Sequence, residues 1–280
     1  MPYTHLSIED ELNIIKDNFV NDISINQIKK KYHISDKKIS DIFFKHGLKP
    51  RKNVHQGKYQ FNNDFFLQDS EYLAYFLGLM SSDGYIASND NHIGIELARK
   101  DKKVLEDISL AMGYNRPILD IERKERGNGE FSKFILENAK IKRLLIDKYG
   151  IVPQKTYDKN FCFNFINLDK KYWKDYIRGY FDGDGSIKIT GTSLTFQIDG
   201  TSIKMLLGIQ QALRGIGCKS ELSLTCRYPQ EEQSGDFQQT LPLYRLYCYS
   251  KSAEEVFHII YHDANIYLQR KFDKYKQYVK

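Results

Sequence analysis

Two aspartates, Asp83 and Asp184, each stand directly before a glycine at the end of an apolar run. The runs read FLGLMSSDG at residues 76–84 and IRGYFDGDG at residues 177–185, and each is followed by a strand-like stretch. An aspartate at a helix C-terminus meets the negative end of the helix dipole, so a cation is needed to offset its charge. Mg²⁺ takes oxygen ligands and keeps several waters, so two carboxylates are enough to hold it. The pattern predicts a divalent-metal site.

The two runs also predict the helices that must position these carboxylates. Small residues recur four positions apart and therefore lie on one helix face: Gly78 with Ser82, and Gly179 with Gly183. Glycine inside a helix costs about 0.5–1 kcal/mol relative to alanine, and its value here is that two backbones can approach closely. We therefore expect the two helices to pack against each other. The glycines that end the runs, Gly84 and Gly185, predict left-handed helix ends.

The ordinary interpretation of each run is a helix cap, because Asp-Gly is a common turn dipeptide. The surrounding repeat favours the functional interpretation, since both halves continue in the same order. The first half predicts strands at 93–97, 118–123 and 131–136 and helices at 101–112 and 139–149; the second predicts strands at 194–198, 221–228 and 241–249 and helices at 202–214 and 252–265. With the strand after each aspartate, each half reads αββαββα.

This arrangement resembles the LAGLIDADG homing endonucleases of the monomeric, two-repeat type, over roughly residues 67–280. The resemblance implies an α+β fold in which two pseudo-symmetric αββαββα repeats form DNA-binding sheet saddles. It also implies a site-specific double-strand DNA endonuclease, with Asp83 and Asp184 as catalytic residues that share two or three Mg²⁺ ions with DNA phosphates, and with Mn²⁺ as a possible substitute. The expected partner is double-stranded DNA with a long asymmetric target, bound by a monomer, because one chain carries both carboxylates.

Members of the family also place a basic residue from each half near the cleaved phosphates. The stretches QKTYDK at 154–159 and QRKFDK at 269–274 look equivalent. Their alignment pairs Lys155 with Arg270, and Lys271 is a further candidate for the second half. Exposed lysines also occur simply for solubility, so both interpretations stay open.

The resemblance implies that outward-facing strand residues contact the DNA. Strand alternation selects Glu96, Arg123 and Lys133 in the first half, and Lys188, Thr190, Thr195, Gln197, Asp199, Ser223, Thr225 and Arg227 in the second. A shift of one residue would reverse every assignment, and some of these positions could be solvated strand faces.

The two halves differ in ways that predict an asymmetric target and unequal nicking of the two strands. Ser81 stands where many relatives have an aspartate, whereas the second half keeps Asp182. Relatives often carry a glutamine that positions water near the end of the second strand. Here the corresponding residues are Arg99, which is also expected to contact DNA, and Gly200.

The first fifty residues predict a separate helical module. Residues 6–20 are amphipathic, Ser24 to Gln27 form a capping-box pattern, and Ser35 can cap a third helix that Gly47 ends. The spacing resembles a helix-turn-helix, with Lys37, Lys38, Ser40 and Asp41 as the predicted DNA contacts. Residues 26–52 hold nine basic and two acidic side chains, although the whole chain carries only +6. Such an excess is typical of a module that binds phosphates, or of a solvated face.

The predicted organisation is a helix-turn-helix module at 1–52, a linker at 53–66, and repeats at 67–157 and 158–280. Hydrophobic residues make up 41% of the 280, the mean hydropathy is −0.55, and no long uncharged apolar run argues for a membrane span. No secretory leader is recognisable, so we expect a soluble intracellular protein of the cytoplasm or an organelle matrix. The four cysteines lack metal or redox spacing. His258 and His262 lack the further ligands of a zinc site.

Two other functions remain open on the same fold: an RNA maturase that assists intron splicing, with intron RNA as partner, and a non-catalytic DNA-binding regulator. The presence of both aspartates argues against either, because a pure binding module has no use for adjacent buried like charges. An intein is disfavoured, because the chain lacks a splice-junction Cys or Ser after Met1 and a terminal His-Asn pair.

Overall fold

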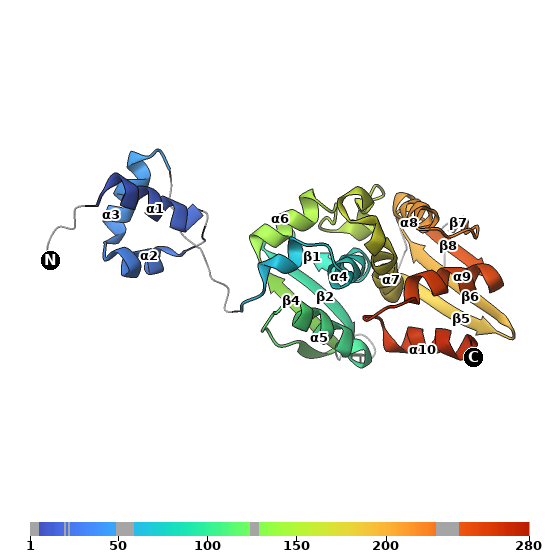
Figure 1. Ribbon diagram of the computed structural model, residues 1–280. Coiled ribbons are helices and arrows are strands. Elements are labelled where there is room, and N and C mark those ends of the chain that lie inside the picture. The colour runs from blue at the N-terminus through green and yellow to red at the C-terminus, as the bar shows by residue number, and fades with distance from the viewer. Residues whose placement is uncertain are drawn as a thin grey trace. The chain divides into compact units, whose positions relative to one another are not determined.

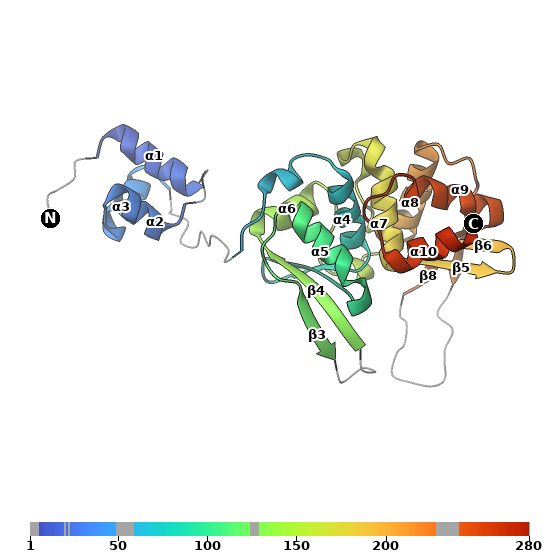
Figure 2. The same cartoon turned by 60° about the horizontal axis from the view of Figure 1, so that its bottom comes forward.

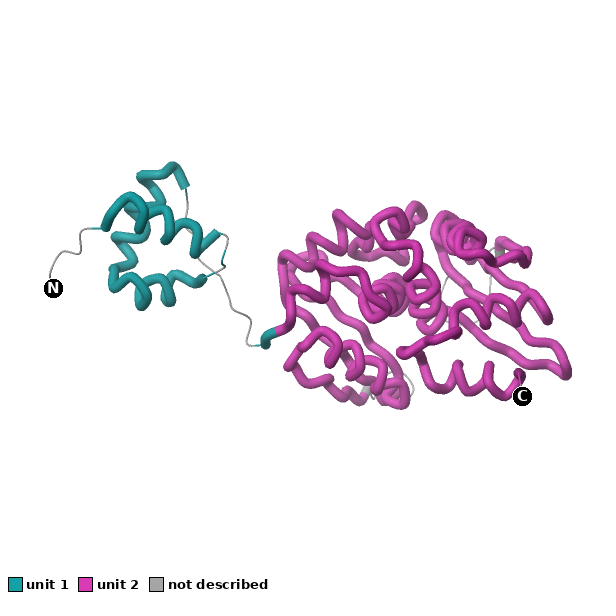
Figure 3. The backbone as a smooth tube through the Cα atoms, viewed as in Figure 1, with its two compact units in different colours: residues 1–60 teal, residues 61–280 magenta. Residues whose placement is uncertain are grey.

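The computed structural model describes residues 6–19, 21, 23–48, 59–123, 129–227 and 241–279. The chain divides into two compact units, residues 1–60 and residues 61–280 (Figure 3). The first part of the predicted linker, residues 53–58, lies outside the described residues. Its last part is not extended, because Asn63–Phe66 forms the short 3₁₀ helix η1, capped by the Asn62 side chain.

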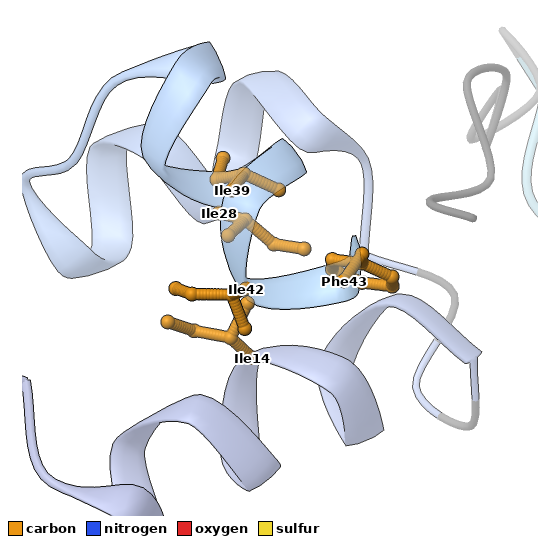
Figure 4. Packing of buried hydrophobic residues seen from close by; sticks show 5 residues of the cluster. All are labelled: Ile14, Ile28, Ile39, Ile42 and Phe43. Carbon is orange, nitrogen blue, oxygen red and sulfur yellow. The ribbon is translucent and has the colours of Figure 1, made fainter. Parts of the chain in front are cut away.

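The N-terminal unit contains three described helices: α1 (Ile8–Phe19), α2 (Ile25–Tyr32) and α3 (Asp36–Lys45). One apolar residue from α1, one from α2 and three from α3 meet in a small buried core (Figure 4), namely Ile14, Ile28, Ile39, Ile42 and Phe43. The predicted capping box is present at Ser24 and Gln27. Ser35 caps α3 by accepting from the Lys38 amide. Local capping and one apolar stripe per helix thus account for this unit.

The second unit contains the two predicted αββαββα repeats. The first is α4 (Glu71–Ser81), β1 (Gly84–Ile86), β2 (His92–Ala98), η2 (Arg99–Asp101), α5 (Lys102–Ala111), β3 (Leu119–Arg123), β4 (Gly129–Glu137) and α6 (Ala139–Asp147). The 3₁₀ turns η3 (Lys155–Tyr157), η4 (Phe165–Asn167) and η5 (Lys170–Tyr172) lead into the second: α7 (Trp173–Asp184), β5 (Gly185–Thr190), β6 (Ser193–Gly200), α8 (Ile203–Gly215), β7 (Ser223–Arg227), β8 (Leu243–Tyr249) and α9 (Ser250–Tyr261). A last helix, α10 (Gln269–Tyr278), follows.

Each repeat forms one antiparallel four-stranded sheet, with strand orders β1-β2-β4-β3 and β5-β6-β8-β7. The helices pack on one face of each sheet (Figure 2). The cores are aromatic: Phe76 and Phe134 meet in the first repeat, and Phe181, Phe196 and Phe257 in the second. The predicted α+β class and repeat order are confirmed.

Helices α4 and α7 lie side by side at the centre of the second unit (Figure 1). A Cβ atom built on Gly78 would lie 2.6 Å from the Tyr180 amide nitrogen and would collide with the Tyr176 carbonyl oxygen. One built on Gly179 would collide with the backbone of Tyr75. The predicted contact through these small residues is therefore present.

The predicted left-handed ends of the two helices are wrong. Gly185 is extended, with φ −83° and ψ 160°, and Gly84 is not among the residues with positive φ. Glycine is required at both positions because a larger side chain would collide with the preceding helical turn, and not because the backbone is left-handed. A Cβ at Gly84 would lie 2.5 Å from the Met80 Cα, and one at Gly185 would collide with the Phe181 carbonyl oxygen.

A buried arginine joins the two repeats beside these helices. Arg178 on α7 is fully buried and donates to the carbonyl oxygens of Ile260 and Ile266 and to the carboxylate of Glu71 on α4, each at 2.7 Å. Glu71 also accepts from the backbone and side chain of Asn265. Each of the three guanidinium nitrogens therefore has a partner, as a buried charge requires, and the segment before α10 is held against α4.

Candidate active site

The two motif aspartates come together at adjoining ends of α4 and α7. A Cβ built on Gly183, the residue before Asp184, would lie 3.1 Å from Oδ2 of Asp83. Both aspartates keep a solvent-exposed surface. Strands β1 and β5 start at the next residue in each repeat. The packed helices thus present two carboxylates to solvent at the point where both sheets begin.

The surrounding protein disfavours the charged form of both carboxylates. Although both residues keep an exposed surface, protein atoms surround the carboxyl group of Asp184 closely. This desolvation, followed by the charge of Asp83, raises the pKa of Asp184 to about 7, against the favourable charges of Lys155 and Lys271 and a hydrogen bond from Tyr180. Burial also raises the pKa of Asp83. Mutual repulsion between two carboxylates is typical of a site that a cation completes.

Lys155 and Lys271 occupy equivalent positions in the two repeats. The Lys155 ammonium donates to the carbonyl oxygen of Gly84, the residue after Asp83. The Lys271 ammonium donates to Gly185, the residue after Asp184, at 2.6 Å, and to Phe181 and Asp182 at 2.7 and 2.8 Å. The predicted pairing of Lys155 with Arg270 is therefore wrong. Lys155 lies in a 3₁₀ turn and Lys271 in an α-helix, so a gap-free alignment of the two stretches does not match their directions.

The two lysines form the basic side of the site. Both are buried, and burial lowers the pKa of each, to about 8 for Lys271. The charges of Asp83 and Asp184 act in the opposite direction and favour the ammonium forms. The site thus places two basic groups beside two carboxyl groups.

Arg270 binds an acidic residue that sequence analysis missed. Its Nε donates to both carboxylate oxygens of Asp101, at 3.0 and 3.2 Å. Asp101 belongs to η2 of the first repeat, so this ion pair crosses between the repeats. Arg270 lowers and Asp101 raises the pKa of Asp83, which places both near the first carboxylate. Only the fold reveals the pair, since the two residues are 169 positions apart.

Asp182, the additional acid of the second motif, is structural. It is fully buried and accepts from the Tyr75 hydroxyl and the Leu268 amide at 2.7 Å and from the Tyr261 hydroxyl at 3.2 Å. Leu268 directly precedes α10, so Asp182 fixes the helix that carries Lys271. Ser81 instead donates to the Leu77 carbonyl oxygen of its own helix.

The second sheet turns its polar residues away from the core. In β6 the buried residues Leu194, Phe196 and Ile198 alternate with less buried ones. The face opposite the core includes the predicted residues Lys188, Thr190, Thr195, Gln197, Asp199, Ser223 and Thr225. It also carries residues that the strand alternation had not selected, among them Arg245, Tyr247 and Tyr249. Arg245 binds Asp199 through two hydrogen bonds, at 2.7 and 2.9 Å.

In the first sheet, Glu96 and Lys133 are cross-strand partners on the corresponding face. Arg99 does not lie with them, because it forms ion pairs with Glu130 at 3.1 Å and Glu122 at 3.6 Å. The other position compared with Arg99, Gly200, ends β6. The side chains of Arg123 and Arg227, both predicted contacts, lie outside the described residues.

In the N-terminal unit, the predicted contacts Lys37, Lys38, Ser40 and Asp41 are all exposed on α3. Three other lysines form ion pairs within the unit: Lys29 with Asp36, Lys31 with Asp17 and Lys45 with Glu11. Lys37 and Lys38 have no ion-pair partner among the residues that the structure describes. The free positive charge on α3 is therefore concentrated in its first turn.

Other candidate chemistry finds no support in the described part of the chain. No group of three or more His, Cys, Asp or Glu side chains there is arranged to hold a metal. His258 and His262 contact each other edge to face without a third ligand. Cys162, Cys218, Cys226 and Cys248 are free thiols. None of the described helices is long and apolar enough to cross a membrane.

The raised pKa of Asp184 predicts how stability depends on pH when no metal is bound. Between about pH 4 and 7 the folded state keeps this proton and the unfolded chain loses it, so stability falls as pH rises through that window. We expect Asp184→Asn to reduce the fall in Tm between pH 5 and 7.5 in EDTA. Asp263→Asn, at an exposed position, serves as the control and should keep the original slope. Equal slopes in all three proteins would contradict the assignment.

Comparison with a known domain family agrees with this fold. The profile of the LAGLIDADG-like domain matches residues 70–146 and 174–261, together more than half of the chain. No curated protein matches the sequence.

Several solved structures are similar at low identity. Full-length DUF199/WhiA from Thermatoga maritima is 15% identical, with a TM-score of 0.44 over 75% of this chain and 59% of that one. The homing endonuclease I-WcaI bound to its DNA recognition sequence is 14% identical, with a TM-score of 0.46 over 82% and 95%. I-DmoI in complex with DNA and Mn is 10% identical, with a TM-score of 0.43 over 69% and 98%. The match to the domain profile, over both repeats, shows that this chain belongs to the LAGLIDADG-like family.

Proposed function

We propose that this protein is a site-specific, metal-dependent endonuclease that cuts both strands of a long, asymmetric DNA target as a monomer. The observation that carries the proposal is the meeting of Asp83 and Asp184 at adjoining helix ends, with one buried lysine beside each. Hydrolysis of a phosphodiester needs an activated water and stabilisation of negative charge on the phosphate. Each repeat supplies one carboxylate and one lysine, so groups for both requirements are present once in each repeat.

The donor set fits Mg²⁺ or Mn²⁺. Asp83 and Asp184 are solvent-accessible carboxylates whose repulsion a divalent ion would relieve, and Mg²⁺ commonly uses one or two protein carboxylates together with substrate phosphates. When bound, two or three such ions shared with DNA phosphates would lower the pKa of a bound water and polarise the phosphate.

Side chains of this protein supply the remaining functions. Lys155 and Lys271 hold the turns that carry the two aspartates through the carbonyl oxygens of Gly84 and Gly185, and place a positive charge beside each carboxylate. Both sheets start at these glycines, so a duplex that reaches both carboxylates passes over both outer faces. Helix α3 adds a second contact, with Lys37 and Lys38 at phosphates.

The test of this proposal is a selection from a randomised duplex library. The purified protein is incubated with the library in Mg²⁺ and, separately, in EDTA, and the cut ends are sequenced. We expect discrete ends at one long site in Mg²⁺ only. Selective binding without cutting would replace the endonuclease by a DNA-binding regulator. Binding to structured intron RNA, with no duplex binding, would replace it by a maturase.

The ion pair between Arg270 and Asp101 predicts unequal cutting of the two strands. The described part of the first repeat has no equivalent pair: Gln154 precedes Lys155 where Arg270 precedes Lys271, and Ser202 stands before α8 where Asp101 stands before α5. We expect Asp101→Asn to slow nicking of one strand by about 10-fold, the low end of the loss from removing a group that orients a charged catalytic residue. Nicked plasmid would then accumulate. Equal slowing of both strands would contradict the prediction.

A further inference from the structure

The outer faces of the two sheets differ sharply in chemistry. In the first sheet, five apolar side chains point away from the core: Tyr85, Leu119, Ile121, Phe131 and Ile135. We call this set the apolar face. Leu119 is 41% and Tyr85 37% exposed, and the other three are half-buried. The outer face of the second sheet consists mainly of hydroxyl, amide and charged groups.

Cross-strand rows make the contrast direct. The row nearest the motif glycine is Tyr85, Gly94 and Ile135 in the first sheet, but Ser186, Gln197, Tyr247 and Ser223 in the second. The next row is Glu96, Lys133 and Leu119 in the first sheet, but Asp199, Arg245 and Thr225 in the second. The acid–base pair recurs in both sheets, whereas the residue beside it changes from leucine to threonine.

Two glycines shape the apolar face. A Cβ on Gly94 would lie 2.5 Å from Cζ of the Tyr85 ring, and one on Gly129 would lie 2.5 Å from Cε2 of the Phe131 ring. The Tyr85 ring therefore lies directly on its cross-strand partner Gly94, and the Phe131 ring lies on Gly129, two residues earlier in the same strand. The Lys133 ammonium is 5.0 Å from the centre of the Tyr85 ring, within the range of a cation–π contact. A positive charge thus lies beside the Tyr85 ring.

Continuity with the cleavage centre identifies what covers this face. Tyr85 is two residues from Asp83, and its row begins beside the site, as the row of Ser186 begins beside Asp184. A duplex that reaches both carboxylates must therefore pass the apolar face as well as the polar one. In the major groove, thymine alone presents a methyl group, and apolar side chains read that group.

Resting on the proposed function, we propose that the first repeat recognises its half-site through the methyl groups of thymines, and the second repeat through hydrogen bonds to base edges. The target is then thymine-rich over one half only. Leu119 and Ile121 are specificity-determining residues, and Lys133 among them neutralises a neighbouring phosphate.

Replacing thymine by uracil tests this proposal, because it removes the methyl group and leaves every hydrogen-bonding group of the base in place. The full-length Asp184→Asn protein is titrated with duplexes of the selected site that carry uracil in one half, the other half, or neither. We expect a loss of affinity of about fourfold per contacted methyl, as for about 0.8 kcal/mol per buried group, from one half-site. The other half should change less than twofold.

A matched pair of variants assigns the effect to the face. Leu119→Ser with Ile121→Thr, which installs side chains of the polar sheet, should abolish the uracil effect. Thr225→Val, at the equivalent position of the second sheet, should leave it unchanged. A circular dichroism melt confirms that each variant is folded.

Failure of this proposal differs from failure of the proposed function. Mg²⁺-dependent cutting with equal uracil effects on both halves, or with an effect that persists in the double variant, overturns the thymine assignment alone. A chain that binds no duplex overturns both. A dimer in sedimentation that Leu119→Ser dissociates, without thymine preference, would show instead that a second copy covers the face.

Discussion

Asp83→Asn and Asp184→Asn are each expected to abolish double-strand cleavage while DNA binding is retained. An amide cannot carry the negative charge that holds a divalent cation, and a metal site contributes several kcal/mol to transition-state stabilisation. Since about 1.4 kcal/mol corresponds to a tenfold change in rate, the loss should be at least about 10³-fold. The measurement is the single-turnover cutting rate on the selected site, with the Kd determined in parallel.

Retained binding is an essential part of that result, because relief of the repulsion between the two carboxylates should leave the unit as stable as before or more so. Asp263→Asn, at an exposed loop position, is the control and should cut at the original rate. Cutting by either motif variant within tenfold of the original protein would remove that aspartate from the catalytic centre. Loss of binding together with cutting would make its role structural.

Gly78→Ala and Gly179→Ala are expected to be the most destabilising single-methyl changes in the second unit. The added methyl would collide with backbone atoms of the opposite helix, which cannot rotate away as a side chain can. Overpacking of a core costs about 1–3 kcal/mol of folding stability. Because each new methyl would meet the backbone of the partner helix, these variants should lie at the upper end of that range. About 3 kcal/mol corresponds to a fall in Tm of about 6–12 °C for a unit of this size.

Gly208→Ala provides the matched control for these two variants. Gly208 also lies inside a helix, but the nearest atom to a new methyl is the Cys162 sulfur at 3.3 Å. Alanine favours the helix by up to about 1 kcal/mol, so this variant should be as stable as the original protein or slightly more stable. A fall in Tm at Gly208 as large as at Gly78 would mean that the close approach of α4 and α7 is not the cause.

The repeated local pattern was sufficient to predict the architecture. Apolar alternation with a period of two identified the strands, and runs with small residues every fourth position identified α4 and α7. These signals are local, because backbone geometry sets which side chains share a face. Alternation also assigned Gln197 and Asp199 to the face opposite the core. It could not predict the facing of Arg99, since that residue lies just beyond β2, where the alternation stops.

Details of the site were harder to predict than its carboxylates. Lys271, and not Arg270, is the counterpart of Lys155, because the rotation of α10 about its axis decides which of two adjacent side chains points at Gly185. Adjacent residues on a helix point about 100° apart, so a one-residue error in alignment exchanges an interior position for an exposed one. No periodicity in a six-residue segment distinguishes the two.

The type and order of the elements within each repeat follow from residue types and spacing along the chain, as do the two aspartates with their glycines, because each depends on neighbours a few positions away. Helix α10, which follows the second repeat, was not predicted. The meeting of Arg270 with Asp101, the anchoring of α10 by Asp182 and the contrast between the two sheet faces depend on packing between segments far apart in sequence. Such contacts are set by the relative rotation and distance of whole helices and strands, which side-chain packing in the folded core determines.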